Sequence, residues 1–381
     1  VVVASGAEAF ARLDGLAPGW WAGVASYDLG RAVERVSPRG GAAEPAPPDL
    51  VLARFGTRAV LDPVTGGVEI VGDGPARPLL EQAARDAVGE VGDARPAPPG
   101  LDPDGWRSSL DRAAFEARVG EILALIGAGE CYQVNLTRRL TWARAADPVG
   151  LYAELERRNP APHAALVRVA SRRACEPVAV VSASPECFLR WQGPDVETRP
   201  IKGTATDAAM LQASAKDRAE NVMIVDLARN DLGRVCEPGS VHVAALCALE
   251  AHPGLHHLVS TVRGRMREGV GQGALLRATF PPASVTGAPK PRVLQIIEDL
   301  EPVRRGVYCG AVGWIDTERG AGELAVAIRT FTVTAGATHL GVGSGIVADS
   351  EPAAEWAETE LKAARLLAAA GAGLRAPALA S

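Results

Sequence analysis

The segment after Gly129 restricts the fold most. Between residues 132 and 137, apolar and polar side chains alternate one by one. This period of two predicts a half-buried strand, with one face on the core and the other offering amides and hydroxyls. Similar strand-like runs follow at 178–182, 324–333 and 338–342. Because these runs have hairpin-like spacing and long helices between them, we predict an α+β fold with large, mostly antiparallel sheets.

A predicted helix start and a linker-like segment divide the chain into an N-terminal and a main region. A helix is predicted to begin after Asp111, a residue type that caps helix N-termini. Apolar side chains continue it at helical spacing, at Phe115, Val119, Ile122 and Ile126. Segment 96–105 is rich in Pro and Gly and is typical of an exposed connection. We therefore predict an N-terminal region with its linker over 1–105, a main region over 106–372 and a tail over 373–381.

Charge and cysteine spacing exclude several classes of protein. The 40 basic and 45 acidic residues give a net charge of −5, which argues against a nucleic-acid binder. Charged residues interrupt every long apolar run, so no membrane span is expected. None of the six cysteines forms a C-x-x-C pair, which argues against a zinc ribbon or a disulfide framework. The first residues lack the basic leader of a signal peptide, and we expect a cytoplasmic protein.

Lysine is unusually scarce. Only four of the 40 basic residues are lysines, and the other 36 are arginines: the lysines are Lys202, Lys216, Lys290 and Lys362. Codon bias explains the bulk of the arginines. Arginine cannot lose its proton in a protein, whereas lysine can serve as an amine nucleophile. Some of the four lysines are therefore candidates for chemistry.

Two predicted helices carry paired acids three residues apart. One begins near Ser214 and the other after Ser350, and their acids are Asp217 with Glu220 and Glu355 with Glu358. Each pair projects from one helix face. Acids in a first turn also complement the helix dipole without further function. Taken together, the pairs could hold a hard divalent cation, and we expect Mg²⁺.

Two further segments offer backbone amides to an anion. The glycine run 341–345 is predicted to be a loop between a strand and the second acidic helix. Segment 286–290 (T-G-A-P-K) is predicted to be a turn that starts a helix, and it needs no function as a plain turn. No Ser/His/Asp order and no histidine cluster is present, so neither a hydrolase nor a zinc enzyme is indicated.

These segments occur together with a series of motifs. In chain order the motifs are C-Y-Q-V-N-L from Cys131, S-P-E from Ser184, P-I-K-G-T from Pro200, K-D-R-A-E-N from Lys216, H-H-L-V-S from His256, T-G-A-P-K from Thr286, Y-C-G-A from Tyr308, A-I-R-T from Ala327 and G-I-V-A-D-S from Gly345. Over about residues 111–367 the sequence closely resembles the chorismate-utilising enzymes. The resemblance implies the chorismate-binding enzyme fold, a sandwich of large sheets with helices outside. A weaker match near residues 20–31 resembles the N-terminal region of anthranilate synthase component I.

Lys202 distinguishes the branches of this family. Anthranilate synthases typically have alanine at this position, and the aminodeoxychorismate branch has lysine. In that branch the lysine is thought to attack C2 of chorismate and expel the C4 hydroxyl, after which ammonia attacks C4. The resemblance therefore implies synthesis of 4-amino-4-deoxychorismate for p-aminobenzoate and folate, a transferase activity of the transaminase class.

The resemblance also implies roles for other residues. Glu220 and Glu358 would be the main Mg²⁺ ligands, and Glu355 and Asp217 would assist directly or through water. Glu186 would be the acid that helps the C4 hydroxyl leave, and His257 would orient that hydroxyl. The implied substrate-binding residues are Tyr308, Arg329, Thr286, Gly343, Gly345 and Lys362. For Lys290, an anion-binding role and a structural role both remain open.

The family also implies an ammonia donor. No cysteine here lies in the G-x-C-x-G elbow of a glutaminase, so we expect a glutamine amidotransferase subunit on a separate chain. One departure concerns the loop after K-G-T, where relatives usually have an arginine and this chain has Ala205, Thr206 and Asp207.

Several alternatives remain. Anthranilate synthase component I is the nearest, although Lys202 argues against it. Isochorismate and salicylate synthases activate water with a lysine at or near the position of Gln133, and no lysine lies in that strand. A catalytically silent chorismate-binding subunit is an alternative of another class. A pyridoxal-phosphate enzyme with Lys202 as the Schiff base would show a visible absorption band.

Overall fold

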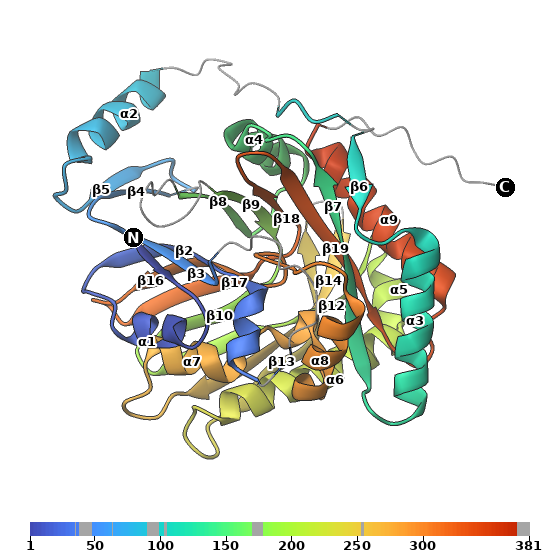
Figure 1. The fold of residues 1–381 in the computed structure, drawn as a ribbon. Coiled ribbons are helices and arrows are strands. Elements are labelled where there is room, and N and C mark those ends of the chain that lie inside the picture. Colours follow the sequence, from blue (N-terminus) through green and yellow to red (C-terminus); the bar gives the residue numbers. More distant parts are fainter. Residues whose placement is uncertain are drawn as a thin grey trace.

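The computed structural model describes residues 1–34, 36–37, 48–62, 64–89, 99–102, 105–169, 178–252 and 255–371. Half of the predicted linker (96–98 and 103–104), the tail at 373–381 and Cys175 lie outside these residues. The other five cysteines are buried and free. Long antiparallel sheets with helices outside confirm the predicted α+β class (Figure 1).

Two large sheets make the framework. The first has ten strands in the described residues, in the spatial order β1 (Val2–Ala4), β3 (Leu50–Phe55), β2 (Trp20–Ala25), β16 (Ala311–Asp316), β17 (Ala321–Val326), β10 (Cys187–Gln192), β11 (Asp195–Arg199), β14 (Leu255–Arg265) and β12 (Ile201–Ala205), with β13 (His242–His252) also on β14. The second has seven, in the order β15 (Gly287–Ala288), β7 (Gln133–Trp142), β19 (Thr338–Ile346), β18 (Thr330–Val333), β9 (Val178–Ser184) and β8 (His163–Val169), with β6 (Trp106–Ser108) also on β7. A hairpin of β4 (Arg58–Leu61) and β5 (Val68–Val71) stands apart from both sheets.

Helices cover the outer sides of the two sheets (Figure 1). The ten-stranded sheet packs on α1 (Glu8–Asp14), α5 (Ala208–Ala213), α6 (Ala215–Gly233) and α7 (Gln272–Thr279). The seven-stranded sheet packs on α3 (Arg112–Gly127), α4 (Pro148–Arg158), α8 (Lys290–Leu300) and α9 (Pro352–Ala369). α2 (Arg77–Gly89) contacts the β4–β5 hairpin, and two short 3₁₀ helices are η1 (Tyr27–Ala32) and η2 (Ala283–Val285).

The expected helix starts are present. Asp111 caps α3 by accepting a hydrogen bond from the Ala114 amide at 2.8 Å, and Ser214 caps α6 by accepting one from the Asp217 amide at 3.2 Å. Both are side-chain caps of the kind that stabilise a helix by about 1 kcal/mol. The cap at Ser214 fixes where α6 begins, and therefore where its acidic side chains lie.

Small apolar side chains hold the inner faces of the two sheets together. Val24 and Val312 come from the ten-stranded sheet and pack with Val180 of the seven-stranded sheet. Larger cores lie on the outer sides, against the helices. As in other sandwiches, the side chains of each strand alternate between the two sides of its sheet.

Three strand predictions need correction. The run at 324–333 is two strands, β17 and β18, which belong to different sheets and are separated by residues 327–329. The glycine run 341–345 is not a loop, since it lies inside β19 and pairs with β7. β7 is not half-buried as predicted but buried on both faces, because helices cover one side of its sheet and the other side faces the interior of the sandwich. Tyr132, the first residue of the predicted strand, is exposed and precedes β7.

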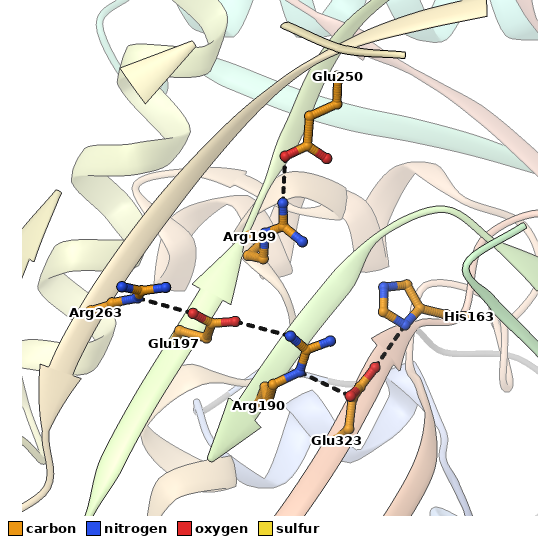
Figure 2. Close-up of polar contacts among 7 residues, drawn as sticks. All are labelled: His163, Arg190, Glu197, Arg199, Glu250, Arg263 and Glu323. Carbon is orange, nitrogen blue, oxygen red and sulfur yellow. Dashed lines mark hydrogen bonds and ion pairs between the residues drawn. The ribbon is translucent and has the colours of Figure 1, made fainter. Parts of the chain in front are cut away.

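A row of alternating charges crosses the ten-stranded sheet (Figure 2). Neighbouring side chains form ion pairs across adjacent strands, and the row consists of Glu323, Arg190, Glu197 and Arg263, with His163 of β8 at one end. Arg199 and Glu250 form a second pair beside it. Cross-strand pairs of opposite charge favour one register. Glu250 is itself paired in register with His257, for which the family resemblance implies a role.

Among the described residues, no helix is both long and apolar enough to cross a membrane.

Candidate active site

A glycine brings the strand that carries Lys202 close to an acidic helix. Lys202 lies in β12, followed by Gly203 with φ +82°. A Cβ at Gly203 would lie 2.9 Å from the Cβ atom of Asp217, in the first turn of α6. Only glycine combines this backbone conformation with so close an approach. The K-G-T motif therefore places Lys202 against the acidic face of α6.

The side chains of Lys202 and Glu220 are neighbours and are largely buried. The Lys202 Nζ atom is 3.6 Å from Glu220 Oε2, and the two side chains are 13% and 16% exposed. Burial raises the pKa of Glu220, and the nearby carboxylates of Asp217 and Glu358 raise it further, whereas Lys202 opposes this shift. Carboxylates from α6 and α9 are therefore close enough to repel each other.

Gln133 of β7 completes this corner of the site. Its side chain is fully buried, and neither its amide nitrogen nor its amide oxygen has a hydrogen-bond partner in the described part of the chain. A Cβ placed on Gly345 would lie 2.8 Å from Gln133 Nε2 and 3.3 Å from Lys202 Nζ. An unpaired buried amide is costly, so this arrangement suits a site whose ligand supplies the partners.

Glu186 is a buried carboxyl group between β9 and β10. Its side chain is almost fully enclosed, and burial raises its pKa to about 7. A hydrogen bond from Ser284 and the charges of Lys202 and Arg329 oppose that shift. A carboxyl group that titrates near neutral pH can serve as a general acid.

His257 lies in β14 and is held by the strand beside it. Its Nδ1 atom is 2.8 Å from the Thr204 hydroxyl, and the ring is buried. Thr204 follows Lys202 by two residues in β12 and pairs in register with His257. This contact fixes the orientation of the imidazole relative to the strand of Lys202.

Arg329 occupies the break between β17 and β18. Its backbone has φ +51°, a conformation that costs energy for a side chain other than glycine. Burial and the nearby Arg365 lower its pKa, and the Glu186 carboxylate raises it. The strained turn thus directs a guanidinium group toward the neighbourhood of Glu186.

Helix α9 presents its polar side chains to β19. Lys362 donates to the Gly343 carbonyl at 2.9 Å and pairs with Glu358 at 2.6 Å, and the Glu358 side chain is 48% exposed. Glu355 is instead buried, and its carboxylate accepts hydrogen bonds from Ser344 and Ser350. Glu355 therefore fixes the start of α9, whereas Glu358 faces the side of Glu220.

Tyr308 and Thr286 lie a little farther along the inner face. The Tyr308 ring packs against Gly341, where a Cβ would lie 2.2 Å from the ring. This ring lines a cavity beside the buried Glu301–Arg305 ion pair. The Thr286 hydroxyl donates to the Pro282 carbonyl at 3.0 Å, so in this structure it is engaged within its own turn.

Lys290 has a structural partner. Its ammonium group is buried and donates to Asp231 at 2.6 Å and to the Thr279 carbonyl at 3.0 Å. This pair ties α8 to α6. Of the two roles that the sequence left open for Lys290, the geometry favours the structural one.

The structure brings together Lys202, Glu220, Gln133 and Gly345, and links Glu186 electrostatically to Lys202 and Arg329. In the described residues, no group of three or more His, Cys, Asp or Glu side chains is arranged to hold a metal ion. Gln133 and Thr204 had no predicted role, although both lie in motifs that carry the family resemblance, C-Y-Q-V-N-L and P-I-K-G-T.

Comparison with known proteins places the whole chain in one family. Residues 3–368 match the family model described as chorismate binding enzyme. The chain is 39% identical over 356 residues to aminodeoxychorismate synthase component 1 of Klebsiella aerogenes, which covers 91% of this chain and 76% of that protein. It is also 43% identical over 275 residues to anthranilate synthase component 1 of Streptomyces coelicolor, covering 70% and 53%.

A solved structure agrees with this assignment. Anthranilate synthase component I from Streptococcus pneumoniae TIGR4 superposes with a TM-score of 0.75 at 28% identity, covering 94% of this chain and 84% of that one. The fold expected from the sequence motifs is therefore confirmed.

Proposed function

The chain belongs to the chorismate binding enzyme family, and from this premise we propose that it converts chorismate and ammonia to 4-amino-4-deoxychorismate. The observation that carries the proposal is the position of Lys202. This amine lies on a strand in the half-enclosed site, beside Glu220 and the unpaired amide of Gln133. Relatives named as aminodeoxychorismate synthase component 1, at 36–39% identity, support the same reading.

In the first step, the neutral amine of Lys202 attacks C2 of chorismate. A bond forms between the lysine nitrogen and C2, the ring double bond shifts, and the bond from C4 to its hydroxyl breaks. Glu186 gives its proton to the departing hydroxyl, which leaves as water. The lysine nitrogen becomes a secondary ammonium group, and Glu186 becomes a carboxylate. A buried acid near pKa 7 suits this proton transfer.

In the second step, ammonia attacks C4. The electron pair shifts back through the ring, the bond between C2 and the lysine nitrogen breaks, and Lys202 is released as a neutral amine. The new C4 ammonium group returns one proton to Glu186. The two steps together consume chorismate and ammonia and produce the amine and water, so protons and electrons balance.

Two carboxylates, one from each acidic helix, would hold Mg²⁺, an ion that keeps several waters and takes only one or two protein carboxylates. Glu220 and Glu358 supply carboxylate oxygens, the ligand type that Mg²⁺ prefers, and their mutual repulsion would be relieved by a cation between them. Asp217 would assist directly or through water. Glu355, whose carboxylate accepts hydrogen bonds from Ser344 and Ser350, would have to reorient to do the same. When bound, the ion would neutralise a substrate carboxylate.

Two cationic side chains would orient the substrate. Arg329 can grip a carboxylate in a two-pronged hydrogen bond, and the backbone turn at this residue fixes its direction. Lys362 reaches the Gly343 carbonyl from α9 and could turn to a bound carboxylate. Tyr308 and Thr286 would have to reorient to contact the substrate. Gly343 and Gly345 add no side chain to β19 where it lies against Thr137, Gln133 and Lys202.

We further propose that ammonia comes from a glutamine amidotransferase subunit on a separate chain and that the product serves p-aminobenzoate and folate synthesis. The relatives' names, which designate a component 1, support a partner. Free ammonia at high concentration would replace that partner in the test tube.

Product analysis tests the proposal. The chain is incubated with chorismate, Mg²⁺ and ammonium chloride, and the products are separated by chromatography. We expect 4-amino-4-deoxychorismate. Anthranilate as the sole product would instead establish the second candidate, which the similarity to anthranilate synthases favours. Binding of chorismate without any turnover would identify a silent subunit.

A further inference from the structure

Helix α9 carries a row of charged side chains along one face. Glu358, Lys362 and Arg365 are spaced by four and three residues, which places them above one another on the helix. Glu358 reaches the candidate site, because its charge adds to the rise in the pKa of Glu220 that burial causes. Lys362 reaches it as well, through its hydrogen bond of 2.9 Å to the Gly343 carbonyl. Arg365 is the next member of this row, and the proposed reaction gives it no role.

Arg365 is a neighbour of Arg329, the arginine at the break between β17 and β18. Burial lowers the pKa of Arg329, the positive charge of Arg365 lowers it further, and the Glu186 carboxylate opposes this shift. Arg365 is exposed at the rim, whereas Arg329 is half-buried. Within the described ranges, neither guanidinium group forms a hydrogen bond or an ion pair. Two neighbouring like charges repel each other, so an anion between them would be favourable.

The charges around the site are divided between two ends. Asp217, Glu220 and Glu358 form an acidic end, where the proposed Mg²⁺ would bind. Arg329 and Arg365 form a cationic end. Along α9, Arg365 follows Glu358 by a rise of about 10 Å. Chorismate carries one carboxylate on ring carbon C1 and another on the enolpyruvyl group, which is joined through oxygen to C3. The two ends of the site therefore match the two carboxylates of one substrate molecule.

We propose that Arg365 binds the enolpyruvyl carboxylate of chorismate together with Arg329. Because this role concerns the substrate of the proposed function, it rests on that function. Arg329 holds the carboxylate from inside the site, and Arg365 reaches it from the exposed rim. A guanidinium group suits this task, since it presents two parallel N–H groups to a carboxylate. The reacting carbons C2 and C4 lie in the ring, so Arg365 contributes to binding and not to bond making.

Chorismate binding by Arg365→Gln tests the proposal. Because Arg365 is exposed, we expect this variant to fold. Calorimetry with Mg²⁺ and without ammonia gives Kd for chorismate, and steady-state amination gives KM and kcat. We expect Kd and KM to rise about fivefold or more and kcat to stay within about twofold, because the contact is equally strong in the ground state and the transition state.

Two single variants separate the role of the guanidinium group from that of net charge. Arg365→Lys keeps the charge without the two parallel donors, so its Kd should lie between those of the wild type and Arg365→Gln. Arg112→Gln is the matched control, because it makes the same change of net charge at an exposed arginine of α3, a helix that packs on α9. We expect this control to bind chorismate like the wild type.

A double variant tests whether the two arginines share one carboxylate. If they do, Arg329→Gln and Arg365→Gln together should weaken chorismate binding by less than the product of the two single effects. Effects that multiply would place the arginines on different groups and overturn the inference, as would a wild-type Kd and KM for Arg365→Gln. Both results leave the proposed function standing. Anthranilate as the sole product, with binding that still depends on Arg365, would contradict the proposed function alone, and a chain that binds no chorismate would contradict both.

Discussion

The Lys202 amine lies 3.6 Å from the Glu220 carboxylate, so the proposed nucleophile and a proposed metal ligand are direct neighbours. They come from β12 and α6, and the glycine after Lys202 allows these two elements to touch. Any ion held by Glu220 would therefore place its substrate carboxylate beside the amine. The proposed nucleophile and the proposed metal ligands therefore belong to one site.

Gly345 is expected to be required for activity rather than for folding. Gly345→Ala places a Cβ 2.8 Å from Gln133 Nε2 and 3.3 Å from Lys202 Nζ, so both flexible side chains must shift. We expect a loss of amination of about tenfold or more, because small misplacements of reacting groups are costly. Gly127→Ala is the control, since nothing lies within 4 Å of the added Cβ. Equal activity of both variants would contradict this packing.

Glu186 should make the stability depend on pH. Its pKa is about 7 in the folded chain, against an ordinary value of 4.5, because it is buried. The folded state therefore favours the proton, and the resulting stability is full below pH 4.5 and is lost as the pH rises through 7. Urea unfolding at several pH values should show this loss in the wild type relative to Glu186→Gln. A constant difference between the two chains would contradict a raised pKa.

Removing one carboxylate should weaken the response to Mg²⁺. Glu358→Gln is expected to raise the Mg²⁺ concentration for half-maximal amination by about tenfold or to abolish turnover. Asp226→Asn, an exposed acid on α6, should leave the Mg²⁺ response unchanged. Titration of Mg²⁺ into the protein by calorimetry gives a second readout. A Glu358→Gln chain with wild-type Mg²⁺ behaviour would refute this ligand.

The buried ion pair of Arg305 and Glu301 should stabilise the fold only while both partners are present. Arg305 also donates to the carbonyls of Val285 and Asn135, so it joins η2 to β7. Arg305→Met would leave Glu301 buried without its partner, and we expect a loss of about 3–5 kcal/mol in the free energy of unfolding.

Two comparison variants make this measurement specific. Arg305→Met combined with Glu301→Gln should recover part of the loss, because the unpaired charge is then removed. Arg229→Met, at an exposed pair with Asp226, should cost no more than about 1 kcal/mol. Equal losses at the buried and the exposed pair would contradict the assignment.

Local signals in the sequence predicted much of the framework. The caps at Asp111 and Ser214 depend on neighbours within a few residues, and such features can be read directly. The alternation at 132–137 predicted the strand itself but not its burial on both faces. The acidic pairs were likewise placed on the correct helices, since helical spacing alone sets which face they share.

Features that depend on distant partners were not predictable in the same way. The glycine run in β19 looked like a loop, because its pairing with β7 and its contact with the Tyr308 ring come from far along the chain. The break at Arg329 reflects the transfer of the chain from one sheet to the other. The burial of Gln133 likewise involves β19 and β12, which meet its side chain only in the folded chain.

The rate of C4 amination by Lys202→Ala tests the central claim most directly. The chain is assayed with chorismate, Mg²⁺ and saturating ammonium chloride, beside the wild type and Lys202→Arg, which keeps the charge but cannot act as an amine nucleophile. We predict folded proteins in which both substitutions lower the rate of 4-amino-4-deoxychorismate formation by about a thousandfold or more. Formation of the same product by Lys202→Ala at the wild-type rate would contradict covalent catalysis by Lys202.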